Sequence, residues 1–189
     1  MNAAPMIAVS GFGRCGSSML MQMLHAGGVP CTGLAPAFED NAVRCAVTPE
    51  YVAEHAGHAV KVLDPQRVGL PGNVRVIWMD RDINEQARSI IKFTELLHGV
   101  CYSRDARRSL PASLRRDRIA AMRVIGQRPL MAMRFESVLR MPISAACRLR
   151  DFVAPLPFDP LAAAAQVRQR DSECAPGLDL ELSLMSGVA

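Results

Sequence analysis

The chain has 189 residues, of which half are hydrophobic and 21% are charged, and this suits one soluble globular domain with a hydrophobic core. Its net charge of +4 comes almost wholly from arginine, because Lys61 and Lys92 are the only lysines. Arginine forks onto phosphate or sulfate oxygens, so the surplus favours an anionic ligand, although a biased composition explains it equally well. No apolar run approaches membrane-spanning length, which excludes a membrane-spanning protein.

The cysteines are scattered, with no CxxC pair and no metal-ligand spacing. No basic and then apolar leader precedes the first expected strand. These features predict a cytoplasmic protein with reduced thiols, no structural zinc and no disulfides. The six cysteines are Cys15, Cys31, Cys45, Cys101, Cys147 and Cys174.

Strands and helices alternate along the chain. Apolar runs bounded by turn residues predict strands at 6–10, 59–63, 74–79 and 130–135, and a further short strand at the start of 29–41. Helical spacing predicts helices at 17–25, 49–55, 84–98, the second half of 103–127, 136–153 with a break at Pro142, and 159–170. This order predicts a single α/β domain over 1–189: three α/β/α layers, a mainly parallel sheet, and a tail at 172–189.

The segment 11–18, GFGRCGSS, has the glycine spacing of a phosphate-binding loop, between an apolar strand and an amphipathic helix. Such a loop aims backbone N–H groups at one point, where the helix dipole adds positive potential. The lysine that normally follows the second glycine is replaced by Ser17, and a cation stands inside the loop instead, at Arg14. The loop therefore predicts a phosphorylated, nucleotide-like ligand.

A second group of polar residues follows the most apolar strand. Asp80-Arg81-Asp82 lies at the expected strand end, and Ser89 lies about two turns into the next helix. Doubly wound sheets bind ligands at the carboxyl ends of their strands, so Arg81 and Ser89 are candidates for holding a second phosphate. The alternative is an ordinary salt bridge for Arg81 and a packing role for Ser89.

These two segments, GFGRCGSSMLMQML and VRVIWMDRDINEQARSIIKF, resemble the sulfotransferases that use 3′-phosphoadenosine-5′-phosphosulfate (PAPS). A third segment, LMAMRFESVL at 130–139, is similar to the L-R-Y-E-D-L-L stretch of that family, and the resemblance runs from about residue 7 to 155. Here the loop has Gly13 and Cys15 where the family has Pro and Ser. No C-terminal Arg-Lys-Gly segment is found.

The resemblance implies a P-loop, sulfotransferase-like fold and binding of PAPS and its product 3′-phosphoadenosine-5′-phosphate (PAP). It assigns the 5′-phosphosulfate to Gly13, Arg14, Cys15, Gly16, Ser17 and Ser18. Arg81 and Ser89 are assigned to the 3′-phosphate, and Phe135 to the adenine. No metal is expected.

In the resembling families, the base that removes the proton of the acceptor is either a histidine or a glutamate. Lys61-Val-Leu-Asp-Pro65 resembles the K-T-H-L-P stretch of the cytosolic enzymes, but Leu63 stands at the position of their catalytic histidine. The protein-tyrosine branch places a glutamate shortly after the loop helix, which makes Glu39 the first candidate. Asp64 and Asp40 are reserves, and Lys61 is expected to contact the cofactor or transition-state oxygens.

Eight arginines gather in 104–128, which is either a flap that recruits an anionic acceptor or a solvated basic helix. Nucleic-acid binding is disfavoured because no aromatic residues are interleaved.

Together these features predict sulfuryl transfer from PAPS to a hydroxyl or amine acceptor of unknown identity. The alternatives are a small nucleotide-dependent kinase with Asp80 on magnesium and a catalytically idle binding protein. Homo-oligomerisation stays open.

Overall fold

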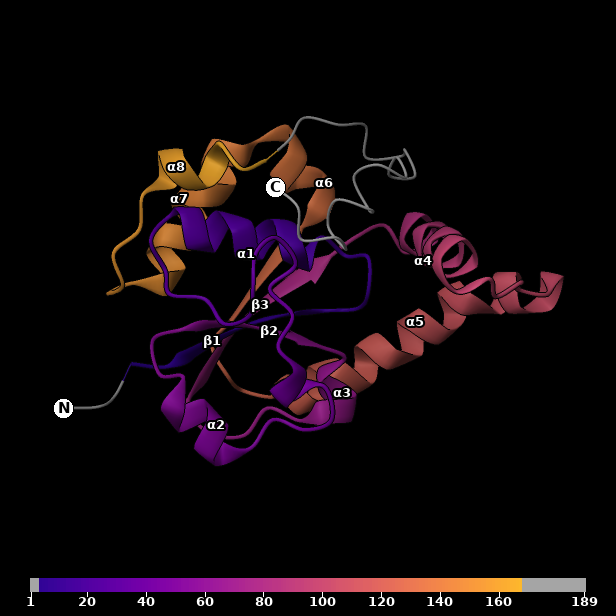
Figure 1. Ribbon diagram of the computed structural model, residues 1–189, viewed down its shortest axis with the longest axis horizontal. Coiled ribbons are helices and arrows are strands. Elements are labelled where there is room, and N and C mark those ends of the chain that lie inside the picture. Colours follow the sequence, from indigo (N-terminus) through magenta and orange to yellow (C-terminus); the bar gives the residue numbers. More distant parts are fainter. Residues whose placement is uncertain (1–3, 168–189) are drawn as a thin grey trace.

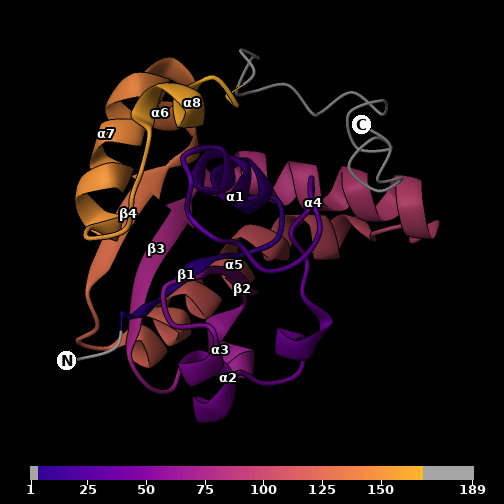
Figure 2. The ribbon, with the colours of Figure 1, turned by 60° about the vertical axis from the view of Figure 1, so that its left-hand side comes forward.

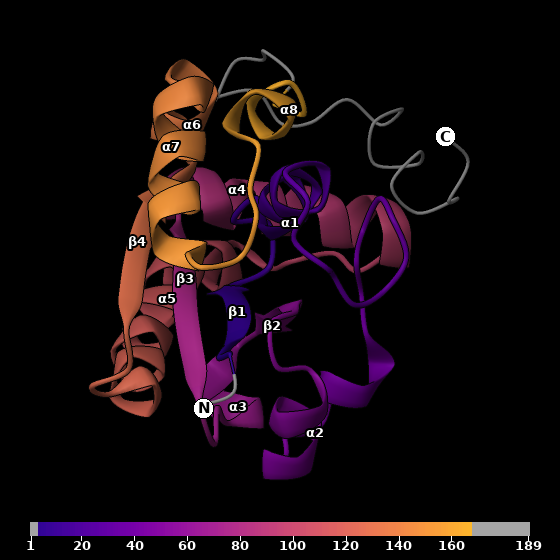
Figure 3. The ribbon, with the colours of Figure 1, turned by 90° about the vertical axis from the view of Figure 1, so that its left-hand side faces the viewer.

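The computed structural model describes residues 4–167, so the expected tail at 172–189 lies outside the described residues. A parallel four-stranded sheet forms the middle of three layers (Figures 1 and 3). Helices α1, α6, α7 and α8 cover one side of the sheet, and α2, α3 and α5 cover the other (Figure 1). The predicted fold class is therefore confirmed.

The strand order is β2-β1-β3-β4, and all three pairings are parallel. In the register, Ile7 lies opposite Ala59 on one side and Arg75 on the other, while Val76 pairs with Leu130. All four carboxyl ends therefore meet at one edge of the sheet, where ligands bind in such folds. The strands are β1 (Met6–Gly11), β2 (Ala59–Leu63), β3 (Val74–Asp80) and β4 (Leu130–Arg134).

Helix α4 begins just after β3 and extends away from the sheet beside the first part of α5 (Figures 1 and 2). The helices are α1 (Ser17–Ala26), the 3-10 helix η1 (Asn41–Val43), α2 (Pro49–Glu54), α3 (Pro65–Val68), α4 (Ile83–His98), α5 (Arg104–Ile125), α6 (Phe135–Arg140), α7 (Pro142–Val153) and α8 (Pro160–Ala164).

Alternating side chains of the strands build two cores. Ile7 and Val9 of β1 face the core under α1 and α7, whereas Met6 and Ala8 face the core that includes Leu114 of α5. This period-two alternation, with apolar residues on both faces, is what a parallel sheet covered on both sides requires. Within residues 4–167, no helix is both long enough and apolar enough to cross a membrane.

Three expected elements differ from the structure, and one helix was not expected. The strand expected at the start of 29–41 is reduced to an isolated bridge between Cys31 and Ala59, next to Pro30, which cannot donate to a ladder. Helix α3 forms directly after β2, where only a strand end was expected. Helix α5 is continuous through Pro111, although only its second half was predicted, and α8 ends at Ala164.

Candidate functional site

The loop after β1 keeps its shape because two glycines lie against other atoms. A Cβ on Gly11 would lie 2.7 Å from Cys15 Sγ, and one on Gly16 would lie 2.5 Å from Cδ2 of Phe135. Gly16 also has φ 99°, in the left-handed region that other residues adopt only with strain. By contrast, nothing lies within 4 Å of a Cβ built on Gly13. The two ends of the loop are therefore packed against the core, and its middle is open.

The positive end of α1 is left open by this loop. Gly16 caps the helix without a side-chain hydrogen bond, and the first turn holds no acidic residue. Helix α4, by contrast, is capped by Asp82, which accepts from the N–H groups of Asn84 and Glu85 at 3.0 Å each. Because the first N–H groups of a helix have no partner within it, the start of α1 can donate to an anion. This geometry fits the anion-binding role expected of Gly16 and Ser18, whereas Ser17 is buried and hydrogen-bonded to the Cys15 thiol.

The loop and the second polar group lie in contact. Arg14, at φ 66°, donates from Nε to Ser89 Oγ at 3.2 Å, and its guanidinium lies 4.7 Å from the ring centre of Phe93. In turn, Nη1 of Arg81 donates to the carbonyl oxygen of Arg14 at 3.1 Å. The structure thus brings together three of the predicted site residues: Arg14, Arg81 and Ser89.

Gln86 is a site residue that sequence reasoning missed. Its buried amide nitrogen donates to the carbonyl oxygens of Phe12 and Gly13, at 3.3 and 3.0 Å, and so holds the loop against α4. The available signal was its spacing, because Gln86 precedes Ser89 by three residues and shares its helix face.

Arg81 is a largely buried cation at the end of β3. It is 9% exposed, and its guanidinium lies 4.7 Å from the ring centre of Phe135. Burial lowers the pKa of Arg81, while the charges of Glu136 and Asp82 oppose that shift. A buried guanidinium prefers a negative partner in bidentate geometry, which a phosphate supplies.

The structure does not support an adenine platform at Phe135. Its side chain is 1% exposed, because its ring packs beneath Gly16 and below the guanidinium of Arg81. A ring covered in this way cannot stack on a base. Phe135 instead supports the loop and Arg81 from within the core.

Cys15 likewise does not face the ligand side of the loop. Its thiol is fully buried beneath Gly11, and its N–H donates to the carbonyl oxygen of Phe12 at 3.2 Å. Burial raises the pKa of the thiol, against hydrogen bonding to Ser17 and the charge of Lys61. The thiol of Cys15 therefore fills the space under the loop, and the expected contact of this residue with the phosphosulfate stays a prediction.

Three other predicted residues meet beside the loop. Nζ of Lys61, which is buried on β2, donates to Ser18 Oγ at 3.0 Å and to the carbonyl oxygen of Ala37 at 3.1 Å. Lys61 also forms an ion pair with the carboxylate of Glu39, whose side chain is 46% exposed. A carboxylate, an ammonium and a hydroxyl thus lie together next to the start of α1.

The two reserve acids have other surroundings. Asp40 accepts a hydrogen bond of 2.6 Å from the hydroxyl of Tyr51 and caps η1. Asp64 follows β2 at φ 51°, and its N–H donates to the carbonyl oxygen of Gly11 at 3.1 Å. Burial raises the pKa of the Asp64 carboxyl, which makes it a stronger base than a solvated aspartate.

Asp80, the magnesium ligand of the kinase alternative, is bound by an arginine. Its Oδ2 lies 2.8 Å from Nη2 of Arg118 on α5. Within residues 4–167, no three histidine, cysteine, aspartate or glutamate side chains are grouped to hold a metal ion.

Comparison with known proteins gives matches in structure only. No family model matches the chain, and no curated protein matches it in sequence. The sulfotransferase STF9 from Mycobacterium avium superposes with a TM-score of 0.59 at 11% identity, covering 99% of this chain and 76% of that chain. The sulfotransferase domain of the curacin biosynthetic pathway superposes with a TM-score of 0.55 at 14% identity, covering 94% of this chain and 81% of that chain.

Mouse sulfotransferase SULT7A1, solved in complex with PAP, gives a TM-score of 0.55 at 12% identity, covering 100% of this chain and 68% of that chain. Agreement over nearly all of this chain at such low identity establishes the fold and nothing beyond it. This chain has the α/β fold of the sulfotransferases.

Proposed function

We propose that this protein transfers a sulfuryl group from PAPS to a hydroxyl or amine acceptor. The observation that carries the proposal is the contact between its two anion-binding elements. Arg81 donates to the carbonyl oxygen of Arg14, and Arg14 donates to Ser89. An open helix start and a buried arginine therefore lie next to each other, as a nucleotide with phosphates at both its 5′ and 3′ positions requires.

The residues present fit such a nucleotide. The first N–H groups of α1 and the hydroxyl of Ser18 are suited to the 5′-phosphosulfate, and Arg81 with Ser89 to the 3′-phosphate. When bound, PAPS supplies the activated sulfuryl group. Arg14 and Lys61 supply positive charge on either side of the loop, where negative charge develops on the leaving phosphate.

Glu39 is the proposed base. Its carboxylate is exposed on one side and paired with Lys61 on the other, so it is held beside the start of α1 and is open to an entering acceptor. A carboxylate in this position accepts the proton of a hydroxyl or amine acceptor as the acceptor oxygen or nitrogen attacks sulfur. Asp64, with its raised pKa, is the reserve.

We place this activity in the cytoplasm, where free thiols such as Cys15 and Cys31 stay reduced.

Calorimetry with PAP and with ATP·Mg tests the nucleotide. We expect PAP to bind and ATP·Mg to bind far more weakly, because Arg118 occupies the acid that magnesium would need. Tight binding of ATP·Mg without binding of PAP would overturn the proposal in favour of a kinase. If PAP binds but PAPS is not consumed with any of a broad panel of alcohols, phenols and amines, the protein is a nucleotide-binding relative without turnover.

Two substitutions test the residue roles. Arg81→Ala should weaken PAP by about 10- to 100-fold and adenosine 5′-phosphosulfate, which lacks the 3′-phosphate, much less. Arg44→Ala is the matched control, because Arg44 is exposed in the turn after η1. Equal losses for both ligands would show that Arg81 does not bind the 3′-phosphate.

Glu39→Gln should keep PAP binding and lower turnover by about 10²–10⁴-fold. An unchanged turnover rate would show that another residue is the base.

A further inference from the structure

The outer surface of α5 carries a row of arginines. At 100° per residue, the five positions lie within a sector of about 120°, and they span about 28 Å of helix. We call them the arginine face; its members are Arg104, Arg108, Arg115, Arg116 and Arg123, and all five are exposed.

The arginine face is set apart from the other arginines of the helix by its lack of partners. On the inner side of α5, Arg107 pairs with Glu95 and Arg118 pairs with Asp80. Among residues 4–167, no ion pair involves a member of the arginine face, and Asp105 is the one acid in the same sector. Arg104 and Arg108 lie one turn apart, and like charges at that spacing destabilise a helix, so this pair costs the helix some stability.

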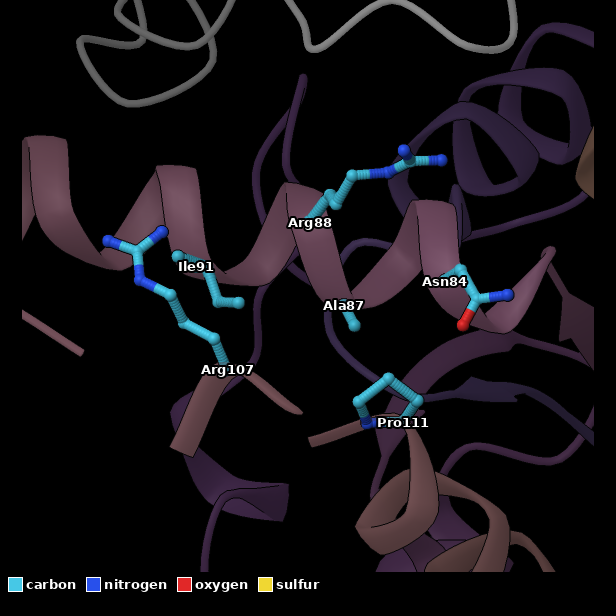
Figure 4. A pocket seen from close by; sticks show the side chains of 6 residues that line it. All are labelled: Asn84, Ala87, Arg88, Ile91, Arg107 and Pro111. Atoms are coloured by element: carbon cyan, nitrogen blue, oxygen red, sulfur yellow. The ribbon is translucent and has the colours of Figure 1, made fainter. Parts of the chain in front are cut away.

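A pocket of about 270 Å³ opens between α4 and α5 (Figure 4). Its apolar lining comes from Ala87, Ile91 and Pro111, and Ala87 and Ile91 are buried in the helix interface. Its polar lining is Asn84, Arg88 and Arg107, and in Figure 4 the Arg88 side chain points away from Pro111. Both guanidinium groups are in ion pairs, Arg88 with Glu85 and Arg107 with Glu95. Pro111, in the lining of the pocket, lies three residues from Arg108 and four residues from Arg115 along α5. The pocket therefore borders the arginine face.

A second apolar point lies within the arginine face itself. Ile119 is 56% exposed and falls in the middle of the sector. Charged residues around a few apolar anchor points are the pattern of a protein–protein interface. A single-stranded nucleic-acid site would show aromatic stacking residues, and α5 contains no aromatic residue.

We propose that the arginine face and the α4–α5 pocket form a docking surface for an acidic amphipathic helix of a partner protein. The acidic residues of that helix pair with the arginine face. One of its apolar side chains enters the pocket and another covers Ile119. This proposal does not depend on the reaction, yet the two are neighbours in space. Helix α4 lines the pocket on one side and carries Ser89 on the opposite side, so the partner would lie about one helix diameter, roughly 10–12 Å, from the loop contact.

The test uses a synthetic helical peptide as long as α5, with glutamates and two leucines on one face. A second peptide of the same composition, with its glutamates spread around the helix, is its control. Binding to the full-length protein is measured by fluorescence anisotropy at about 50 mM salt, where surface electrostatics are strong. Short duplex DNA and phosphatidylserine vesicles are measured in parallel.

We expect the one-faced peptide to bind about 10-fold or more tightly than the control peptide. Arg108→Glu with Arg115→Glu should reduce its affinity by about 10-fold or more, because attraction becomes repulsion. Arg44→Glu with Arg140→Glu, the same charge change at exposed sites elsewhere, should leave it nearly unchanged. Replacing the leucines by alanine should also weaken binding. The proposal would be overturned if the two peptides bound equally well, or if the Arg108→Glu, Arg115→Glu variant bound the one-faced peptide as tightly as the wild type. Tighter binding of DNA or vesicles than of the peptide would also overturn it.

Discussion

The close contact between Gly16 and Phe135 predicts a large effect for one methyl group. In Gly16→Ala, the new Cβ would lie 2.5 Å from Cδ2 and 3.0 Å from Cε2 of the Phe135 ring. That ring is fully buried between the loop and Arg81, so it has little room to move. The backbone at Gly16 also has φ 99°, which alanine adopts only with strain.

Two costs therefore act together at this position. Left-handed backbone costs a non-glycine residue about 1–2 kcal/mol, and one methylene too many in a packed core costs about 1–3 kcal/mol. Alanine recovers about 0.4–1 kcal/mol through the smaller entropy of its unfolded chain. We therefore expect Gly16→Ala to lower the free energy of unfolding by about 2–4 kcal/mol, a large part of the stability of a single domain.

Substitutions at two other glycines allow the backbone cost to be measured apart from the cost of the contact with Phe135. Gly99 has φ 63° and nothing within 4 Å of a built Cβ, so Gly99→Ala carries the backbone cost alone. Gly13 has neither a positive φ nor a near neighbour, so Gly13→Ala should raise the free energy of unfolding by about 0.4–1 kcal/mol through the unfolded-chain entropy alone. The assay is urea denaturation of all three variants and the wild type. The reasoning is refuted if Gly16→Ala costs no more than Gly99→Ala, because contact with Phe135 would then add nothing.

Three further predictions concern side chains around the site. Asp82→Ala should destabilise by about 0.5–2 kcal/mol in urea denaturation, because two N–H groups at the start of α4 lose their acceptor, and Asp82→Asn should retain most of the stability. Tyr51→Phe should cost about 0.5–1.5 kcal/mol in the same assay through the lost bond to Asp40, and a neutral result would mean that the bond does not form in solution. Burial raises the pKa of Asp64, so its contribution to stability falls as pH rises from its unfolded value near 4. Asp64→Asn should therefore gain Tm relative to the wild type between about pH 3 and pH 7, and a constant difference would contradict this.

The main elements follow from the sequence because their local signals agree with their tertiary environment. The apolar run at β3, the capping Thr48 of α2 and the glycines that end α1 each point to the element that forms. The loop was also predictable, since its glycine spacing lies between a strand and a helix. The contact between the loop and Arg81 followed from topology, because β1 and β3 are neighbours whose carboxyl ends meet.

What the sequence does not reveal depends on contacts between distant residues. Pro111 normally interrupts a helix, but Ser103 caps α5 and Leu110 and Leu114 pack against the core, so the helix continues through the proline. Helix α3 forms in four residues because Pro65 stands at its first turn. For α5, no signal in the local pattern outweighs Pro111, whereas Pro65 suits both the end of a strand and the first turn of a helix.

Phe135 was assigned to the ligand by motif, and a motif records position but not burial. The same limit applies to Cys15, which occupies a ligand-facing position in the family motif but points into the core here. Both residues belong to one packing problem: Gly11 admits the thiol of Cys15, and Gly16 admits the ring of Phe135. The loop is thus shaped from below by two buried side chains.

This packing also bears on how, in the proposed function, a loop without the usual lysine would attract an anion. With Cys15 and Phe135 filling the space below, Arg14 is turned outward at φ 66° and reaches Ser89, while Arg81 is fixed above the Phe135 ring. Core packing therefore holds Arg81 against the backbone of the loop that carries Arg14, before any ligand arrives. In the proposed function, positive groups that are fixed in advance would not have to rearrange to receive an anion. The preference for a ligand with two separate phosphates would then rest on the placement of Arg81 beside the loop, which the parallel pairing of β1 with β3 brings about.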